Sequence, residues 1–146
     1  MVTAKDVNSV PHDEPARRPE VIVEFLFDRG MLFLAVNNVG EGPAIDISVK
    51  FDQKIVGLGG SKEISEMPLF RSLKFLGPHR EIVTLVDSTA SYFARRQPVE
   101  VIARVSYKDN RSRQYDEVIR HNLEVFRELA YINGPNETDN HPQAEV

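Results

Sequence analysis

The chain has 146 residues, of which 41% are hydrophobic and 27% charged, and it contains neither Cys nor Trp. This length is close to the usual size of one domain, about 100–150 residues, and the composition is that of a soluble globular protein, which excludes a disordered or fibrous chain. The lack of Cys excludes disulfides, thiol nucleophiles and thiolate metal sites, and a net charge of −4 gives no long-range attraction to nucleic acid or to a membrane surface.

Both ends of the chain are polar and contain several prolines. Residues 1–18 carry mixed charges and no apolar stretch of signal-peptide length, and residues 133–146 are similarly polar. We expect these ends to form disordered tails on either side of one folded domain, residues 19–132. The absence of a secretion signal and of Cys favours a cytoplasmic location.

Two consecutive segments near the start of the domain are apolar on both faces of a strand. Residues 21–27 contain Glu24 as their only polar side chain, and residues 31–36 contain no polar side chain. The connection at residues 28–30 ends in Gly, which supplies the positive φ of a tight turn and predicts a hairpin. We expect the second face of this hairpin to be covered by a tail, by the edge of another sheet or by a partner, because an exposed apolar patch marks an interface.

Period-two alternation in the middle of the chain predicts half-buried strands. Every second side chain is apolar in residues 44–51, and residues 98–108 repeat the pattern. A strand with one polar face favours an antiparallel sheet over a parallel sheet that is buried on both sides.

Further apolar runs, separated by turn signals, complete the set of strands. We predict strands at residues 20–28, 31–38, 44–51, 70–76, 80–87, 98–108 and 113–123. About seven short strands indicate an all-β protein, an immunoglobulin-like antiparallel β-sandwich, with a small barrel as the alternative. Without a disulfide or a Trp, the two sheets of such a sandwich must be held together by Ile, Val, Leu and Phe alone.

Two stretches fit this pattern less well. Residues 54–58 are compatible with an edge strand, followed by a loop that is long for a compact domain. Residues 124–132 are equally compatible with a short C-terminal helix and with a continued strand, because their apolar side chains also recur at helical spacing.

The segment 37–44 carries a recognisable motif, in which a strand ends in Asn and a Gly turn leads through Pro-Ala into an alternating strand. It resembles the "V-x-N-x-G … A-x-x-V-x-V" pattern of bacterial immunoglobulin-like domains of the CARDB (cell-adhesion-related) type. The matching residues are Val36, Asn38, Gly40, Ala44, Ile47 and Val49.

Two later segments extend the resemblance over most of the domain. Residues 76–81 are similar to the "L-x-P-G-E" turn of these domains, although His79-Arg80 stands where a Gly is expected, and residues 105–109 are similar to their "V-x-Y-x-D" strand. The resemblance implies an immunoglobulin-like fold used for adhesion, spacing or interaction, and it assigns no particular function.

The sequence contains no motif typical of catalysis or metal binding. The four His residues lack the spacing of a metal site, and His121 falls on a predicted strand, where a core or cross-strand role is favoured over catalysis. The Gly-rich residues 56–62 are not followed by a clear helix, which disfavours a phosphate-binding loop. We expect no catalytic residue, no metal and no cofactor, and we expect Glu63 and Glu66 in the long loop to be solvated.

Candidate binding residues fall at the two ends of the sandwich, because successive strands run in opposite directions. One end gathers the loops at 37–43, 77–80 and 108–113 and is mostly basic. Its candidate binding residues are His79, Arg80, Lys108, Arg111 and Arg113.

The opposite end contains the segment 88–97, in which aromatic residues stand beside Arg, a composition typical of protein-interface anchors. Its candidate binding residues are Tyr92, Phe93, Arg95 and Arg96. The alternative is that Ser88 or Thr89 caps a helical turn whose Phe93 closes the open end of the core.

These observations favour a non-enzymatic interaction module that binds a protein partner, or itself, through a loop end or an exposed sheet edge. A homodimer formed through the apolar hairpin is its simplest form. A second hypothesis is a sandwich that binds a small ligand or carbohydrate through residues 92–96. A third is an enzyme whose long loop at 55–69 covers a carboxylate site, which is disfavoured because no nucleophile, base and orienting group can be assembled.

Overall fold

Residues 17–129 are described by the computed structural model, and most of the two predicted tails, residues 1–16 and 130–146, lies outside the described residues. The principal strands are β1 (Val21–Asp28), β2 (Met31–Asn38), β3 (Ala44–Phe51), β6 (Leu73–Leu76), β7 (Glu81–Ser88), β8 (Glu100–Lys108) and β9 (Gln114–Asn122). Between β3 and β6 lie the short elements β4 (Val56–Gly57), η1 (Leu58–Gly60), β5 (Lys62–Glu63), η2 (Ile64–Glu66) and α2 (Pro68–Arg71). Helix α3 (Thr89–Ala94) follows β7, and residues 124–129 form a last helix.

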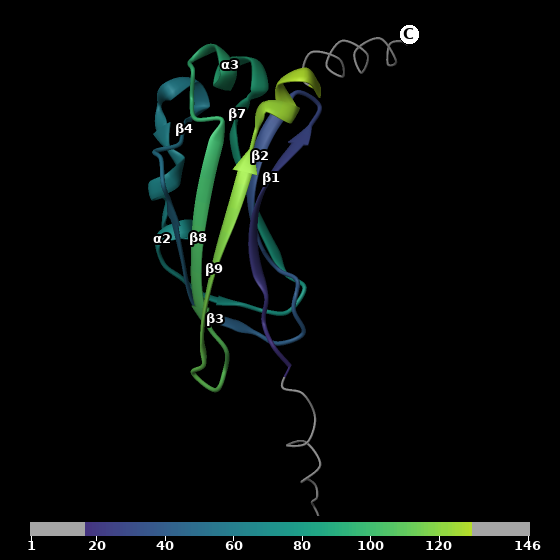
Figure 1. Cartoon of the computed structure of the whole chain (residues 1–146), viewed down its shortest axis with the longest axis vertical. Coiled ribbons are helices and arrows are strands. Elements are labelled where there is room, and N and C mark those ends of the chain that lie inside the picture. The colour runs from purple at the N-terminus through teal and green to yellow at the C-terminus, as the bar shows by residue number, and fades with distance from the viewer. Residues whose placement is uncertain (1–16, 130–146) are drawn as a thin grey trace, which may run out of the picture.

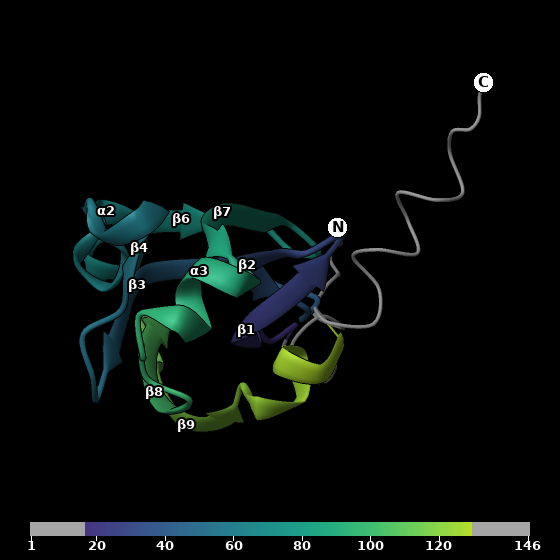
Figure 2. The ribbon, with the colours of Figure 1, turned by 90° about the horizontal axis from the view of Figure 1, so that it is seen from above.

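The principal strands form two antiparallel sheets that face each other (Figures 1 and 2). One sheet has the order β1-β2-β7 and the other the order β6-β3-β8-β9, while β4 and β5 pair in a small ribbon of their own. The two sheets do not join into a closed barrel. The prediction of an all-β antiparallel sandwich with a short C-terminal helix is therefore confirmed.

The predicted strand from residue 70 to residue 76 starts too early. Residues 68–71 form helix α2, and β6 begins at Leu73. Pro68 occupies the first helical turn, where its fixed φ and its missing N–H favour a helix start. The turn directs Phe70 into the core, where its side chain is fully buried and meets the ring of Phe51 edge to face.

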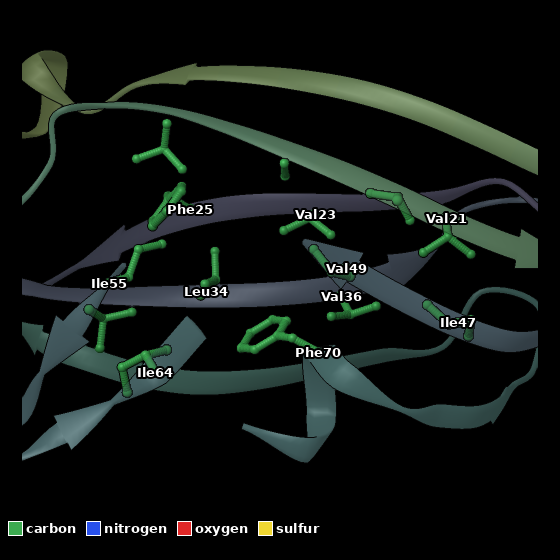
Figure 3. Packing of buried hydrophobic residues seen from close by; sticks show 14 of the residues in the cluster. Val21, Val23, Phe25, Leu34, Val36, Ile47, Val49, Ile55, Ile64 and Phe70 are labelled. Atoms are coloured by element: carbon green, nitrogen blue, oxygen red, sulfur yellow. The ribbon is translucent and has the colours of Figure 1, made fainter. Parts of the chain in front are cut away.

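The core lies between the inward faces of the two sheets, and much of it is drawn in Figure 3. It is built mainly from Val, Ile, Leu and Phe, but the two largest fully buried side chains are Tyr92 and Tyr107. The expectation that Ile, Val, Leu and Phe alone hold the sheets together is therefore wrong. Both hydroxyls have hydrogen-bond partners. Tyr92 donates to the carbonyl of Pro98 and Tyr107 donates to the carboxylate of Glu117, each at a distance of 2.7 Å.

The apolar hairpin of β1 and β2 forms as predicted. Arg29 and Gly30 make its two-residue turn, with φ angles of 52° and 79°, and two positive φ values are typical of a type I′ turn. In the hairpin register Val23 lies opposite Val36, and both side chains point into the core. The register thus assigns one apolar set of side chains to the core and leaves a second set on the outer side of the sheet.

Asn38, the last residue of β2, is completely buried and bonds to three segments of the chain. Its side-chain oxygen accepts hydrogen bonds from the N–H groups of Glu20 and Gly40, each at 3.0 Å. Its side-chain nitrogen donates to the carbonyls of Gly42 at 2.9 Å, Leu76 at 3.0 Å and Gly77 at 3.2 Å. Since Leu76 belongs to β6, this one amide links the ends of both sheets.

The segment at residues 17–20 lies directly against the β2–β3 loop. The carbonyl of Arg18 accepts hydrogen bonds from the N–H groups of Glu41 and Gly42, at 2.9 and 3.2 Å. A Cβ atom on Gly42 would lie 2.2 Å from the carbonyl oxygen of Arg17, and one on Gly40 would lie 2.3 Å from that of Arg18. These glycines are needed because the two backbones approach too closely for any side chain.

We predict that Asn38→Ala strongly destabilises the fold. The substitution removes the Asn38 partner of the buried carbonyls of Gly42 and Leu76 and of the buried N–H of Gly40, and each buried unsatisfied group costs about 1–3 kcal/mol. We therefore expect a loss of about 3 kcal/mol or more in the free energy of unfolding, measured by urea denaturation.

Asn37→Ala is the matched control for this prediction. Asn37 is adjacent in sequence, but among residues 17–129 its side-chain amide forms only an exposed hydrogen bond, to Glu81. Its removal should change the free energy of unfolding by about 0.5 kcal/mol or less. Equal effects of the two substitutions would contradict a central role for Asn38.

Candidate functional site

The segment after β7 forms a capped helical turn that closes one end of the sandwich. The hydroxyl of Ser88 accepts a hydrogen bond from the N–H of Ser91 at 3.1 Å, which caps α3. This turn buries Tyr92 completely, whereas Phe93 remains half-buried. The expected helical turn is therefore present, but Tyr92 and not Phe93 fills the end of the core.

A β-bulge in β7 positions the carboxylate of Asp87 beside this turn. The pairing of β2 with β7 shifts by one residue, so that Leu32 lies opposite Asp87 while Phe33 lies opposite Leu85. Since opposed residues of an antiparallel pair share a face, the bulge turns Asp87 toward the inner side of the sheet. Asp87 is consequently only 6% exposed.

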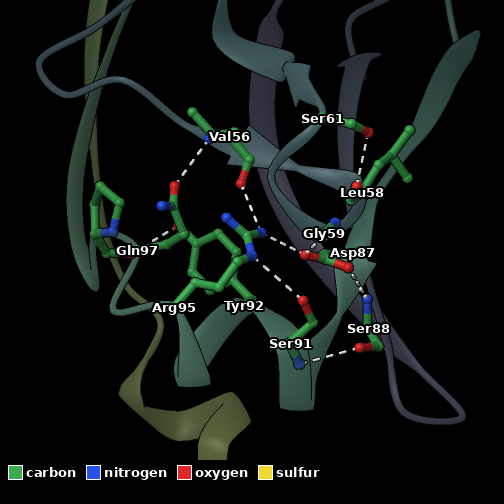
Figure 4. Close-up of polar contacts among 11 residues, drawn as sticks. Val56, Leu58, Gly59, Ser61, Asp87, Ser88, Ser91, Tyr92, Arg95 and Gln97 are labelled. Carbon is green, nitrogen blue, oxygen red and sulfur yellow. Dashed lines mark hydrogen bonds and ion pairs between the residues drawn. The ribbon is translucent and has the colours of Figure 1, made fainter.

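Asp87 and Arg95 form a partly buried ion pair that connects three elements (Figure 4). Arg95 donates to the Asp87 carboxylate at 2.5 Å and to the carbonyl of Val56 at 3.0 Å, and Gly59 donates its N–H to the same carboxylate at 3.2 Å. Burial by itself would raise the pKa of Asp87, but the hydrogen bonds from Arg95 and Gly59 outweigh it and hold the pKa below its ordinary value.

Most of the four candidate residues at this end are engaged inside the molecule. Tyr92 is buried, Arg95 holds Asp87, and the guanidinium of Arg127 covers the ring of Phe93 at 4.5 Å from its centroid. Arg96 is exposed to solvent. The structure therefore uses the aromatic and Arg composition of this segment to hold the end of the sandwich together.

We predict that the Asp87–Arg95 pair stabilises the fold. In a double-mutant cycle with Asp87→Asn and Arg95→Met, we expect a coupling energy of about 1–2 kcal/mol, because the pair is short and mostly shielded from water. Thermal and urea denaturation measure the cycle. Arg96→Met is the control, since this neighbouring Arg is exposed, and a similar loss from Arg96→Met would contradict the assignment.

The basic end of the sandwich is organised by its turns. His79 lies 3.2 Å from the carboxylate of Glu41, and Arg80 is exposed beside it. In the β8–β9 turn, one oxygen of the buried Asp109 accepts hydrogen bonds from the N–H groups of Arg111 and Arg113, at 2.8 and 2.9 Å. Both Arg side chains point to solvent, while the half-buried Lys108 ends β8.

The segment at residues 17–20 separates the basic loops. Its Arg18 binds the β2–β3 loop through its carbonyl, and the Arg18 guanidinium lies 5.1 Å from the ring centroid of Tyr115 in β9. His79 and Arg80 lie in the β6–β7 turn, whereas Lys108, Arg111 and Arg113 lie at the β8–β9 turn. A joint binding site of these five residues stays a prediction.

The long segment between β3 and β6 is attached to the core. Ile55 and Ile64 are buried, and the hydroxyl of Ser65 accepts a hydrogen bond from the N–H of Ile55 at 3.0 Å. Glu63 lies 3.8 Å from Lys54, and Glu66 pairs with Arg71. The two carboxylates are thus paired with cations at the surface, and among residues 17–129 no group of His, Asp and Glu is arranged to hold a metal ion.

The outer side of the β1-β2-β7 sheet carries a group of apolar side chains. In the register of the three strands, Leu26 lies beside Phe33 and Phe33 beside Leu85, and in the next row Ala35 lies beside Val83. We call these side chains, together with Ile22 and Met31 at the two ends, the apolar face. Val83 is 44% exposed, and Ile22, Leu26, Phe33 and Leu85 are partly exposed.

This face is the second side of the apolar hairpin, extended by β7. No helix or strand of residues 17–129 crosses it in Figure 2, and the helix at residues 124–129 contacts the sandwich through Phe126, which stacks on the inward side chain Phe27. The expectation of a cover on the hairpin is therefore not met by any described element. Contiguous exposed apolar patches of this kind mark interaction sites.

His121 lies at the seam between β1 and β9. Its ring meets that of Phe25 edge to face at 5.1 Å, and its Nε2 is buried without a hydrogen-bond partner among the described residues. Burial lowers the pKa of His121 below its ordinary value, although a hydrogen bond to the backbone of Val23 partly opposes this shift. The side chain thus packs in its neutral form, in agreement with the core role that its strand position suggested.

We predict that His121 makes the fold less stable in mild acid. The unfolded chain takes up the proton near the ordinary pKa of about 6.5, whereas the folded protein takes it up only at lower pH. The free energy of unfolding should therefore have its full value above about pH 6.5, as far as His121 is concerned, and should decrease as the pH drops below that value. His121→Phe should flatten this dependence in urea titrations at pH 7.5 and 5.5, and an unchanged dependence would contradict the assignment.

These features define a two-sheet, all-β sandwich with one apolar outer face. Residues 4–127 match the model of a family described as a domain of unknown function (DUF8453), and the chain belongs to this family. No curated protein and no solved structure matches the chain. No helix among the described residues is long and apolar enough to cross a membrane.

Proposed function

We propose that the protein is a non-enzymatic interaction module that binds a protein partner through its apolar face. The observation that carries the proposal is the row of Leu26, Phe33 and Leu85, which is partly exposed to solvent and crossed by no described element. Burying such side chains in an interface releases about 25 cal/mol per Å² of apolar surface, so a partner gains by covering them.

The strand order supports the same class of protein. The sheets β1-β2-β7 and β6-β3-β8-β9 are compatible with an immunoglobulin-like sandwich in which the fourth principal strand has moved to the sheet of the third. Domains of this kind commonly serve as interaction modules, although a fold alone does not define a function.

The two other hypotheses find less support. A ligand site at residues 92–96 would need Tyr92 and Arg95, and both are engaged inside the molecule. An enzyme in which the 55–69 segment covers a carboxylate site would need Glu63 and Glu66 to be available, and both are paired with cations.

We predict that Val83→Lys abolishes binding of the partner. A Lys on the apolar face would have to lose its hydration against an apolar surface, which opposes binding. The full chain, immobilised and exposed to an extract of its native source, should retain a protein that the Val83→Lys variant does not retain. Sedimentation velocity of both proteins tests whether the partner is a second copy.

Val118→Lys is the matched control. Val118 is also a Val of an edge strand with a similar exposure, 49%, but it lies on the outer side of the other sheet. We expect Val118→Lys to bind as the original chain does. Retention of the same proteins by all three chains, each with an unchanged thermal unfolding transition, would contradict the proposal.

A further inference from the structure

The charges on the strands below the apolar face have a single sign. Strands β1 and β7 each contain one Glu and one Asp, β2 contains no charged residue, and none of the three contains Lys, Arg or His. One of these acids, Asp87, is neutralised by Arg95. Glu24, Asp28 and Glu81 form no ion pair in the part of the chain that the structure describes. The apolar face is therefore accompanied by uncompensated negative charge.

Glu24 stands within the apolar rows. It lies opposite Ala35, and this pair is next to the pair of Leu26 and Phe33 on the same face of the sheet. The side chain of Glu24 is partly shielded from solvent. Any partner that covers the face removes more water from this carboxylate. A buried charge without a counterion is strongly unfavourable, so a fitting partner must place a cation near Glu24.

A second copy of this chain does not meet that requirement through the same face. In a symmetric dimer the two faces would meet, and each would bring only carboxylates to the interface. Desolvation and like-charge repulsion would both oppose such a dimer. The charge of the face thus favours a partner with basic residues over self-association.

The dimensions of the face match one helix. Two strand spacings of about 4.8 Å separate the outer strands β1 and β7, which gives a width of about 10 Å, close to the diameter of a helix. Each strand has eight residues, a length of about 26 Å, which corresponds to about 17 residues of helix at 1.5 Å per residue. Sheet faces are commonly covered by helices packed along the strands.

From charge and dimensions together, we infer that the apolar face binds a basic amphipathic helix of a partner protein. This inference rests on the proposed function and names the chemistry of the partner. The apolar stripe of the helix lies on Leu26, Phe33 and Leu85, and its Lys or Arg residues face Glu24 and Glu81. The helix would contact Val83, which is exposed, and Leu26, Phe33 and Leu85, which are partly exposed.

The inference is tested with two synthetic peptides of 18 residues. Both carry Leu at the spacing i, i+3, i+4 and i+7, and one has Lys beside this stripe where the other has Glu. Each is titrated into the ¹⁵N-labelled full chain at low salt. We expect the Lys peptide to shift the amide resonances of β1, β2 and β7 and to bind at least about tenfold more tightly than the Glu peptide. Equal affinities, or no binding of the Lys peptide, would overturn the inference.

Charge substitutions on the protein provide the second part of the test. Glu24→Gln combined with Glu81→Gln should weaken binding of the Lys peptide about tenfold, because each partly exposed ion pair contributes modestly. Glu100→Gln combined with Asp116→Asn is the control, since both residues are exposed on the outer side of the other sheet. The control should leave the affinity unchanged.

The outcomes separate this inference from the proposed function. If Val83→Lys abolishes retention of the native partner while the Glu24→Gln and Glu81→Gln pair does not weaken it, the interaction surface stands and the basic helix is wrong. If the original chain sediments as a dimer that Val83→Lys dissociates, a second copy is the partner and the inference is overturned. If Val83→Lys changes neither retention nor sedimentation, the proposed function itself fails.

Discussion

The buried amide of Asn38 is the contact on which the organisation of the fold depends most. Two sheets packed through Val, Ile and Leu side chains are free to shift against each other, because apolar contacts have little directional preference. The amide of Asn38 removes this freedom, since it holds the start of β1, the β2–β3 loop and the end of β6 at fixed distances. Many immunoglobulin-like sandwiches join their sheets with a disulfide. This chain, which lacks Cys, uses the directionality of hydrogen bonds at the end of the sandwich.

The strands could be predicted because each one carries its pattern locally. The alternation of residues 44–51 and the apolar run of residues 31–36 depend only on neighbours in sequence, and both reappear as strands with nearly the predicted bounds. Phe70 was placed wrongly because the same apolar residue suits a strand and a helical turn, and Pro68 decides between them. The role of Asn38 was also not predictable in full, because its partners at Leu76 and Gly77 are distant in sequence.

The site was harder to predict than the fold for the same physical reason. Aromatic and Arg residues at 92–95 suggested a binding surface, with a helical turn capped by Ser88 or Thr89 as the alternative. The turn is present, but the sequence did not show that Tyr92 would face the core in place of Phe93, and the bulge that directs Asp87 inward leaves no clear mark in the sequence. The apolar hairpin did signal an unusual second face. The addition of Val83 to that face requires β7 to pair with β2, a neighbour that lies far away in the chain. Local sequence patterns therefore predicted the part of the apolar face on β1 and β2, whereas the part on β7 follows only from the order of the strands in the sheet.

The positions of the two ends of the described chain have a mechanical consequence. The chain enters β1 at the end of the sandwich where Asn38 lies, and it leaves through the helix at residues 124–129 near α3, at the opposite end (Figure 1). Tension between these ends would act along the strands. It would load the β1–β2 and β8–β9 ladders in shear, so that their hydrogen bonds resist together instead of opening one after another. A force along the long axis would therefore have to break several backbone hydrogen bonds of each ladder at the same time.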